Sequence, residues 1–143
     1  DEILARPASD FVARFVGADR GLKRLALSRV GDLSLQSVVT ARIGSDAADA
    51  RRRCMADPFP YLLVVDEHDR PLEWITASAL AESGPIQAIG GMPATPVFDR
   101  RTTLKDALSM LLASDVQAGI VVDGAGAVRG LVTADMIGER MRP

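Results

Sequence analysis

The residues that build most catalytic and disulfide-bonded sites are nearly missing from this sequence. Its 143 residues include one cysteine, Cys54, and one histidine, His68. A single cysteine excludes an internal disulfide and is too few for a thiolate zinc site. Together with one histidine it gives no nucleophile–base pair and no metal cluster. We therefore expect no catalytic residue, no metal site and no enzymatic activity in this chain.

Charge and hydropathy exclude further classes of protein. Lys and Arg number 17 against 19 Asp and Glu, so the formal net charge is -2 and the basic excess of a general nucleic-acid binder is lacking. No apolar run approaches the length of a membrane-spanning helix, and no signal-peptide pattern occurs. We expect a cytoplasmic protein without a nucleic-acid partner. Its core should be aliphatic, because aromatic residues make up only 4%.

An internal repeat, at an offset of 57 residues and without gaps, determines the expected fold class. Residues 61–66 align with 118–123, and residues 74–77 align with 131–134. Each copy reads as helix, strand, turn, strand and helix, and two such units can bury their apolar sheet faces against each other. We predict an α/β (α+β) fold of two repeats related by a pseudo-twofold axis. Four repeat-related valines should be buried: Val64, Val65, Val121 and Val122.

Helix signals recur in both copies. Ser45 is the expected N-cap in the first copy, and Thr102 or Thr103 is the expected N-cap in the second. The second helix of each copy should start near Thr76 or Thr133. The expected apolar stripes are Ala47, Ala50, Cys54 and Met55 in the first copy and Leu104, Ala107, Leu108, Leu111 and Leu112 in the second.

One segment of the second copy carries a family resemblance. Residues 130–137, Gly-Leu-Val-Thr-Ala-Asp-Met-Ile, resemble the strand-to-helix signature of the CBS domain, which usually occurs in pairs called Bateman modules. Pro96-Val97 followed by residues 103–107 is similar to the start of such a domain. The resemblance implies two CBS repeats packed as a Bateman module and preceded by short helices. The first repeat would cover residues 28–85 and the second residues 86–143.

The first residues resemble a narrower group. Residues 1–17 look like the end of the ATPase domain of ABC transporters for glycine betaine, choline, carnitine or proline, in which a basic helix and a CBS pair follow. No Gly-x-x-x-x-Gly-Lys-Ser/Thr phosphate loop occurs here, so the part that hydrolyses ATP is not in this sequence. Because the sequence opens without Met in the middle of a helix pattern, we expect a piece of a longer polypeptide. Residues 1–27 would be the ATPase tail and a linker helix.

The resemblance implies a regulatory module. It would require no cofactor and would sense an adenine nucleotide, cyclic di-AMP being favoured, or the ionic state, and so control transport. Implied partners are a second copy in a homodimer, the ATPase domain of the same chain, and the membrane permease subunits at the inner face of the cell membrane. Two other hypotheses stay open. One is a ligand-free element that dimerises the ATPase subunits, and the other is a sensor of anionic lipid built on Lys23, Arg24 and residues 51–53.

Two threonines are the leading candidates for ligand contact. Thr76 and Thr133 stand where a strand leads into a helix, so each can cap the helix, contact a nucleotide, or do both. In the resembled family a ribose-binding Asp usually comes three residues later, and here Ala79 and Met136 stand there instead. Asp135 comes one residue early. For Asp135 we favour charge–dipole stabilisation of a first helical turn over a ligand contact.

Four further residues are weighed as ligand contacts. Arg51 aligns with Leu108 of an apolar stripe, so it either snorkels to solvent or faces an interface or a ligand. Trp74 lies on a strand, where a core position is favoured over stacking on a base. Ala77 and Ala118 are small and would leave space for a base.

Overall fold

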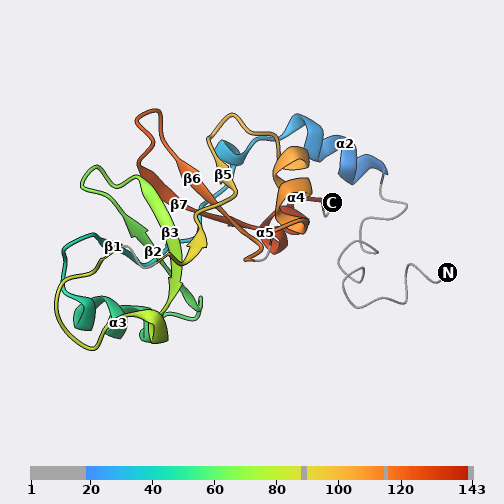
Figure 1. Ribbon diagram of the computed structural model, residues 1–143. Helices are drawn as coiled ribbons and strands as arrows, with labels where there is room; N and C mark the ends of the chain where they lie inside the picture. Colours follow the sequence, from blue (N-terminus) through green and yellow to red (C-terminus); the bar gives the residue numbers. More distant parts are fainter. Residues whose placement is uncertain (1–18, 88–89, 115, 142–143) are drawn as a thin grey trace.

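The computed structural model describes residues 19–87, 90–114 and 116–141, and the expected ATPase tail, residues 1–18, lies outside this range. Two sheets stand in the middle of the molecule, and helices flank them at both ends (Figure 1). The layers therefore follow the order helix, sheet, sheet, helix. Within the described residues, no helix is long and apolar enough to cross a membrane.

The first repeat forms a four-stranded sheet. Its elements are β1 (Thr40–Arg42), α3 (Ala47–Ala56), β2 (Tyr61–Val65), β3 (Pro71–Thr76), the 3-10 turn η4 (Ala77–Ala79) and β4 (Met92–Pro93). The strand order is β1-β2-β3-β4, with β1 parallel to β2 and the other pairs antiparallel. Helix α3 covers this sheet from one side.

The second repeat forms a three-stranded sheet with more helices on it. Its elements are β5 (Val97–Phe98), α4 (Leu104–Leu112), β6 (Ala118–Val122), β7 (Val128–Thr133) and α5 (Ala134–Met141), preceded in the chain by α2 (Asp19–Leu27) and the 3-10 turn η3 (Val30–Asp32). Thr103 caps α4 by accepting a hydrogen bond from the Asp106 amide (3.2 Å), which confirms one of the two expected caps. Leu25 of α2 is fully buried among the residues of α4 and α5, so the expected linker helix is part of this layer.

The strand registers of the two halves are the same after the shift of 57 residues. Ala41 pairs with Val64 in the first sheet, and Phe98 pairs with Val121 in the second. The register also shifts at the same place, directly after Val64 and directly after Val121. The predicted repeat is therefore confirmed down to the positions of individual strand partners.

Both faces of the central strands are buried. Alternate residues of β2 face α3 and the second sheet, because successive side chains on a strand point to opposite faces. Val64, Val65 and Val121 are at most 3% exposed, as predicted. Val122 is only half buried and differs from the prediction, although its repeat equivalent Val65 follows the same register shift and is buried. The core between the sheets contains Leu63, Val65, Trp74, Ala94, Ala118, Ile120 and Leu131.

The two halves exchange their leading segments, which are the residues around Gln36 before β1 and the residues of β4 before β5. Gln36, shortly before β1, forms two backbone hydrogen bonds with Leu131 of β7 (2.9 and 2.8 Å). In return β4, shortly before β5, pairs with β3, where Pro93 stands opposite Glu73. Gln36 and Pro93 are themselves related by the repeat offset. The boundary drawn from the sequence at residues 85 and 86 therefore assigns each leading segment to the half on which it does not pack.

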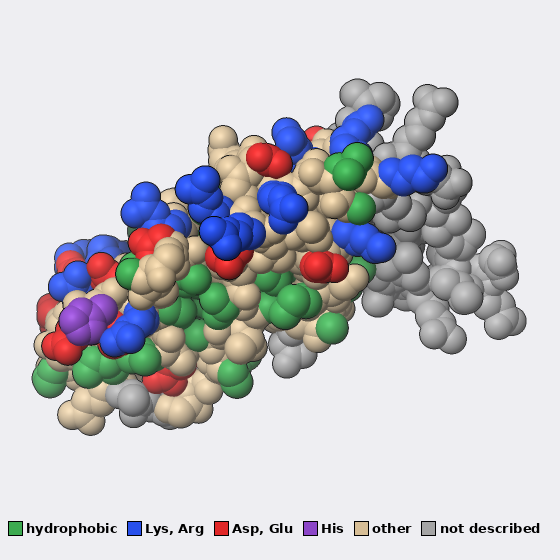
Figure 2. Space-filling model, turned by 90° about the horizontal axis from the view of Figure 1, so that it is seen from above, with side chains coloured by type: hydrophobic (Ala, Val, Ile, Leu, Met, Phe, Trp, Pro, Cys, Tyr) green, Lys and Arg blue, Asp and Glu red, His purple; other side chains and the backbone are tan. Residues whose placement is uncertain are grey.

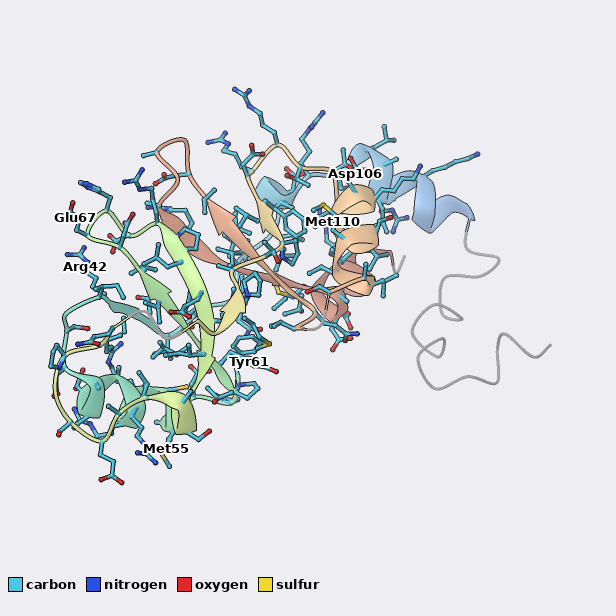
Figure 3. All side chains as sticks on the ribbon, in the orientation of Figure 1. Arg42, Met55, Tyr61, Glu67, Asp106 and Met110 are labelled. Atoms are coloured by element: carbon cyan, nitrogen blue, oxygen red, sulfur yellow. The ribbon has the colours of Figure 1, made fainter. Side chains whose placement is uncertain are left out.

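Four details of the helices differ from expectation. The N-cap of α3 is Asp46, whose carboxylate accepts from the Ala48 amide, whereas the Ser45 hydroxyl donates to the Arg42 carbonyl (2.6 Å). Met55 is 70% exposed and points away from the sheet (Figure 3), because α3 turns that side to solvent. Leu112, at the last position of α4, is also exposed.

The fourth difference is the missing second helix of the first repeat. Thr133 is followed by α5 as predicted, but Thr76 is followed only by the three-residue turn η4. The helical backbone stops at Ala79, because Leu80 already adopts an extended conformation (φ −75°, ψ 146°). The chain instead returns to the first core, where Ile86 is buried and its amide donates to the Ser45 carbonyl (2.8 Å).

Candidate ligand-binding site

An open cavity of about 470 Å³ lies where the two repeats meet at the start of α5. The segment between α3 and β2 supplies one part of its wall, the exchanged leading segment a second, and α5 a third. The lining residues are Pro58, Phe59, Pro60 and Gln36 from the first half and Thr133, Asp135, Met136 and Glu139 from the second. Neither repeat could form this cavity alone.

The second repeat brings two of the predicted residues together. The Thr133 hydroxyl oxygen accepts a hydrogen bond from the Met136 amide (3.3 Å), so the N-cap interpretation is confirmed. Asp135 lies in the first turn of α5, where a negative charge is favourable, and it is exposed. Both residues line the cavity. Asp135 can therefore stabilise the first turn of α5, as favoured, and also form part of the cavity wall.

Phe59 connects the cavity to an aromatic cluster. Its ring centroid lies 5.6 Å from that of Tyr61 and 5.6 Å from that of Trp74. Tyr61 stands at the start of β2, in the middle of the molecule (Figure 3). Trp74 is fully buried in the core between the sheets, as favoured, and its indole N–H has no hydrogen-bond partner in the described part of the chain. The cavity therefore has an aromatic wall that is supported from behind by the core.

The remaining candidate residues lie away from this cavity. Thr76 is half buried at the end of β3, and its hydroxyl oxygen is 3.1 Å from that of Ser78. Ala77 packs against the first-repeat core, and Ala118 is buried between the sheets, where it leaves no open space for a base. Arg51 is half buried on α3. Its side chain forms no ion pair with any residue that the structure describes.

The charges around the cavity bear on what it can hold. Asp135 and Glu139 are its charged lining residues, and no Lys or Arg of the described chain lines it. A phosphate group here would meet the N-terminal dipole of α5 but no cationic side chain. Phe59 with its flanking prolines suits a planar apolar group such as a base. Within the described ranges, no group of Cys, His, Asp and Glu could hold a metal ion.

The single cysteine is placed away from solvent. Burial raises the pKa of the Cys54 thiol, and the negative charge of Asp57 raises it further. The thiol therefore stays protonated at neutral pH, which makes it a poor nucleophile. Its role as a buried apolar residue of α3 agrees with the sequence-based interpretation.

Most lining residues of the cavity were not predicted as ligand contacts, and Phe59 and Gln36 are two of them. Phe59 is framed by Pro58 and Pro60 directly before a buried strand, and because prolines fix the backbone this pattern was a usable signal for an aromatic residue held in place. Gln36 gave no signal, because it contributes through a single isolated bridge to Leu131 rather than through a periodic pattern.

Comparison with known proteins identifies the fold of the chain and a protein of related sequence. No family model matches the chain. It superposes on the CBS domains of a transcriptional regulator from Streptococcus pneumoniae with a TM-score of 0.64 and 16% identity, covering 78% of this chain and 97% of that one. The chain folds as a CBS pair. Another CBS pair, CBSX2 of Arabidopsis thaliana in complex with AMP, gives a TM-score of 0.57 at 19% identity, covering 78% of this chain and 94% of that one.

The sequence of this CBS pair is related to a transporter subunit. It is 31% identical over 140 residues, 97% of the chain, to the osmoprotectant import ATP-binding protein OsmV of Salmonella typhimurium. The CBS pair spans 37% of the length of that relative. The expected resemblance to ATP-binding subunits of osmoprotectant importers is thereby confirmed.

Proposed function

We propose that this CBS pair is the regulatory end of the ATP-binding subunit of an osmoprotectant importer. The relationship to OsmV carries the proposal, because it runs along 97% of the chain and is not confined to the strands that define the fold. In this role the CBS pair performs no chemistry of its own. ATP would be hydrolysed by an ATPase domain of the same polypeptide, and permease subunits would hold the assembly at the inner face of the cell membrane.

The proposed ligand is an adenine nucleotide, with cyclic di-AMP favoured over a mononucleotide. CBSX2, which has the same fold, is known in complex with AMP. In this chain Ala79 and Met136 occupy the positions of the ribose-binding Asp, and Asp135 and Glu139 make the cavity wall acidic. A mononucleotide inside one CBS pair would therefore lack a ribose contact and a cation for its phosphate. A dinucleotide between two CBS pairs would use backbone groups and hydroxyls such as that of Thr76.

A homodimer is part of this proposal. Val97, Met110 and Leu112 are 41%, 48% and 41% exposed, although all three are large and apolar. Val97 and Met110 line one open cavity of about 510 Å³, together with Met92 and Pro93 of β4. A second copy would cover these side chains, and closed twofold pairing is the commonest arrangement of oligomers. Light scattering should give a dimer, and a monomer at high micromolar concentration would contradict this part of the proposal.

A thermal-shift series with AMP, ATP, S-adenosylmethionine and cyclic di-AMP tests the ligand. Cyclic di-AMP should raise the melting temperature most, by the equivalent of roughly 2.7 kcal/mol at 100 times its dissociation constant. Thr76→Val should reduce the shift with little loss of fold, and Asp135→Asn, the control in the cavity at the start of α5, should leave it unchanged. Strong AMP binding that depends on Asp135 would refute the preference for a dinucleotide.

The alternative function is dimerisation of the ATPase subunits without a ligand. The observation in its favour is the absence of an Asp at the ribose position in both repeats, at Ala79 and Met136. It predicts a dimer in light scattering and no melting shift with any of the four compounds.

A further inference from the structure

A second cavity, separate from the one at α5, lies at the other end of β7. It has a volume of about 600 Å³ and opens between η3, the loop after β5 and the turn between β6 and β7. Figure 2 looks down on this loop side of the molecule and shows Lys and Arg side chains gathered across it. The charged residues that line the cavity are Arg29, Arg100, Arg101, Asp32, Asp99 and Asp123.

The three carboxylates of this cavity are engaged by the backbone. Asp32 accepts a hydrogen bond from the Arg29 amide (2.9 Å), and Asp99 accepts one from the Arg101 amide (2.8 Å). Asp123 accepts two from amides of its own turn (2.9 and 3.1 Å). Carboxylates that bond neighbouring amides in this way hold turns in shape. Within the described ranges, none of the three forms an ion pair with an arginine of the cavity.

The guanidinium groups, in contrast, are largely uncommitted. The side chains of Arg100 and Arg101 form no hydrogen bond or ion pair within the described part of the chain. Arg29 donates one N–H to the Arg101 carbonyl (2.5 Å), which leaves most of its five donors available. Three arginines therefore face one cavity, and no acidic side chain of the described residues is bound to any of them.

Backbone hydrogen bonds join the two segments that carry the arginines. The Val30 amide donates to the Thr102 carbonyl (2.8 Å), and the Gly31 amide donates to the Arg100 carbonyl (3.0 Å). A Cβ on Gly31 would lie 3.0 Å from the Arg100 Cβ, so glycine is what allows the two segments to come this close. Because η3 and the loop after β5 are joined by backbone bonds, Arg29 and Arg100 are held at a constant separation at their Cα atoms.

A smaller cavity of about 290 Å³ adjoins the first one. The two share the wall formed by Gly31, Arg100, Val122 and Asp123. The smaller cavity adds a fourth arginine and an apolar floor, namely Arg129 with Val30, Leu33, Leu35 and Val121. The combined site thus offers cationic groups at its mouth and apolar side chains beneath them.

We propose that this cavity binds a small molecule that carries a phosphate group. The phosphate contacts Arg29, Arg100 and Arg101, because the planar guanidinium forms paired charge-assisted hydrogen bonds with phosphate oxygens. The less polar part of the ligand lies toward Leu33 and Leu35. This site differs from the α5 cavity, whose wall is acidic, and does not depend on the proposed function.

Calorimetric titration of the chain with sodium pyrophosphate tests the site. The ionic strength is held constant with sodium chloride, so that general screening of charge does not contribute. We expect saturable binding, weakened about tenfold or more in Arg100→Gln/Arg101→Gln, because each of these charge-assisted hydrogen bonds contributes to affinity. Lys23→Gln/Arg52→Gln removes the same charge from exposed positions outside the cavity and should bind like the wild type.

Three outcomes would overturn the proposal. The first is absence of saturable binding at constant ionic strength. The second is equal weakening in the two double variants, which would indicate a general charge effect. The third is sedimentation with phosphatidylglycerol vesicles, lost in Arg100→Gln/Arg101→Gln, without any binding of pyrophosphate. That result would assign the arginines to a lipid headgroup rather than to a free ligand.

Discussion

The two repeats follow one backbone plan but bury very different amounts of side chain beneath their helices. Helices α2, α4 and α5 cover the second sheet, whereas α3 and a 3-10 turn cover the first. At equivalent buried positions the first repeat has Ala47 and Cys54 where the second has Leu104 and Leu111. The strand registers are nevertheless the same. Register is therefore determined by the strands and turns, and stability is concentrated where the helices contribute large side chains.

At one pair of equivalent positions the two repeats place the large and the small side chain on opposite strands, and the summed side-chain volume stays similar. The first repeat has Ala41 on β1 and Leu62 on β2, and the second has Phe98 on β5 and Gly119 on β6. A Cβ on Gly119 would collide with the Phe98 ring. The two solutions fill the space between strand and helix with similar total volume, which is the kind of exchange that cores tolerate.

Truncation of equivalent core residues should give the largest difference between the repeats. Leu111→Ala should lower the free energy of unfolding by about 4 kcal/mol, because it leaves a cavity under three helices. Cys54→Ala, at the equivalent position, should cost only about 1 kcal/mol, since it removes one atom. Denaturant unfolding of both variants checks this. Equal losses would show that the first core is as tightly packed as the second.

Exchange of the small and large pair is the next test. Gly119→Leu alone should cost about 3 kcal/mol, because the side chain has no space beside the Phe98 ring. Gly119→Leu/Phe98→Ala reproduces the pair of the first repeat and should recover most of that loss. Thermal unfolding of the single and double variants measures the recovery, with Phe98→Ala alone as the reference. No recovery would mean that the two repeats are not interchangeable at this place.

The equivalent helix caps should give smaller effects. Asp46→Ala and Thr103→Ala each remove one side-chain hydrogen bond at a helix start, at 3.4 Å and 3.2 Å, and each should cost about 1 kcal/mol. Asp46→Asn keeps an acceptor at the same place and should cost less. Chemical denaturation compares the three variants. A much larger loss in Thr103→Ala would show that the caps do not act equally in the two repeats.

The smallest effect concerns pH. The Arg70 amide, followed by the His68 amide and the Arg70 guanidinium, lowers the pKa of Asp66, although partial burial acts in the opposite direction. Because the folded pKa lies below the unfolded one, the stabilisation is complete above the unfolded value and is lost as pH falls through the folded value. Asp66→Asn should therefore be less stable than the wild type at pH 7, with the gap closing in acid. Glu67→Gln, whose side chain is 85% exposed, serves as the control in melts from pH 7 to 3.

The sequence was sufficient for those parts of the fold that repeat or alternate. The runs around Val64 and Val121 are buried on both faces of their strands, so their apolar character is continuous and easy to recognise. The exchange of leading segments was out of reach, because Gln36 and β4 pair over one or two residues and such short contacts leave no periodicity. Asp46 competed with Ser45 as a cap, since both are good N-cap residues one position apart.

Two of the eight lining residues of the candidate site were predicted as ligand contacts. Thr133 and Asp135 lie next to each other on the sequence and on α5, so local signals found them. Phe59 and Gln36 reach the same cavity only through the packing of one repeat on the other, which composition and spacing do not encode. Trp74 was expected in the core rather than against a base, and Ala118 was expected to leave space for a base. The burial of both between the sheets follows from side-chain alternation on β3 and β6.

The exchanged leading segments also constrain how the chain folds as it leaves the ribosome. Residues 28–36 are synthesised early, but Leu131, the strand partner of Gln36, emerges almost a hundred residues later. The first repeat likewise lacks its edge strand until β4 has been made. Contacts between residues so distant in sequence are slow to form. The repeats should therefore fold together only after both have been synthesised, and a chain stopped between them should leave an open sheet edge available to chaperones.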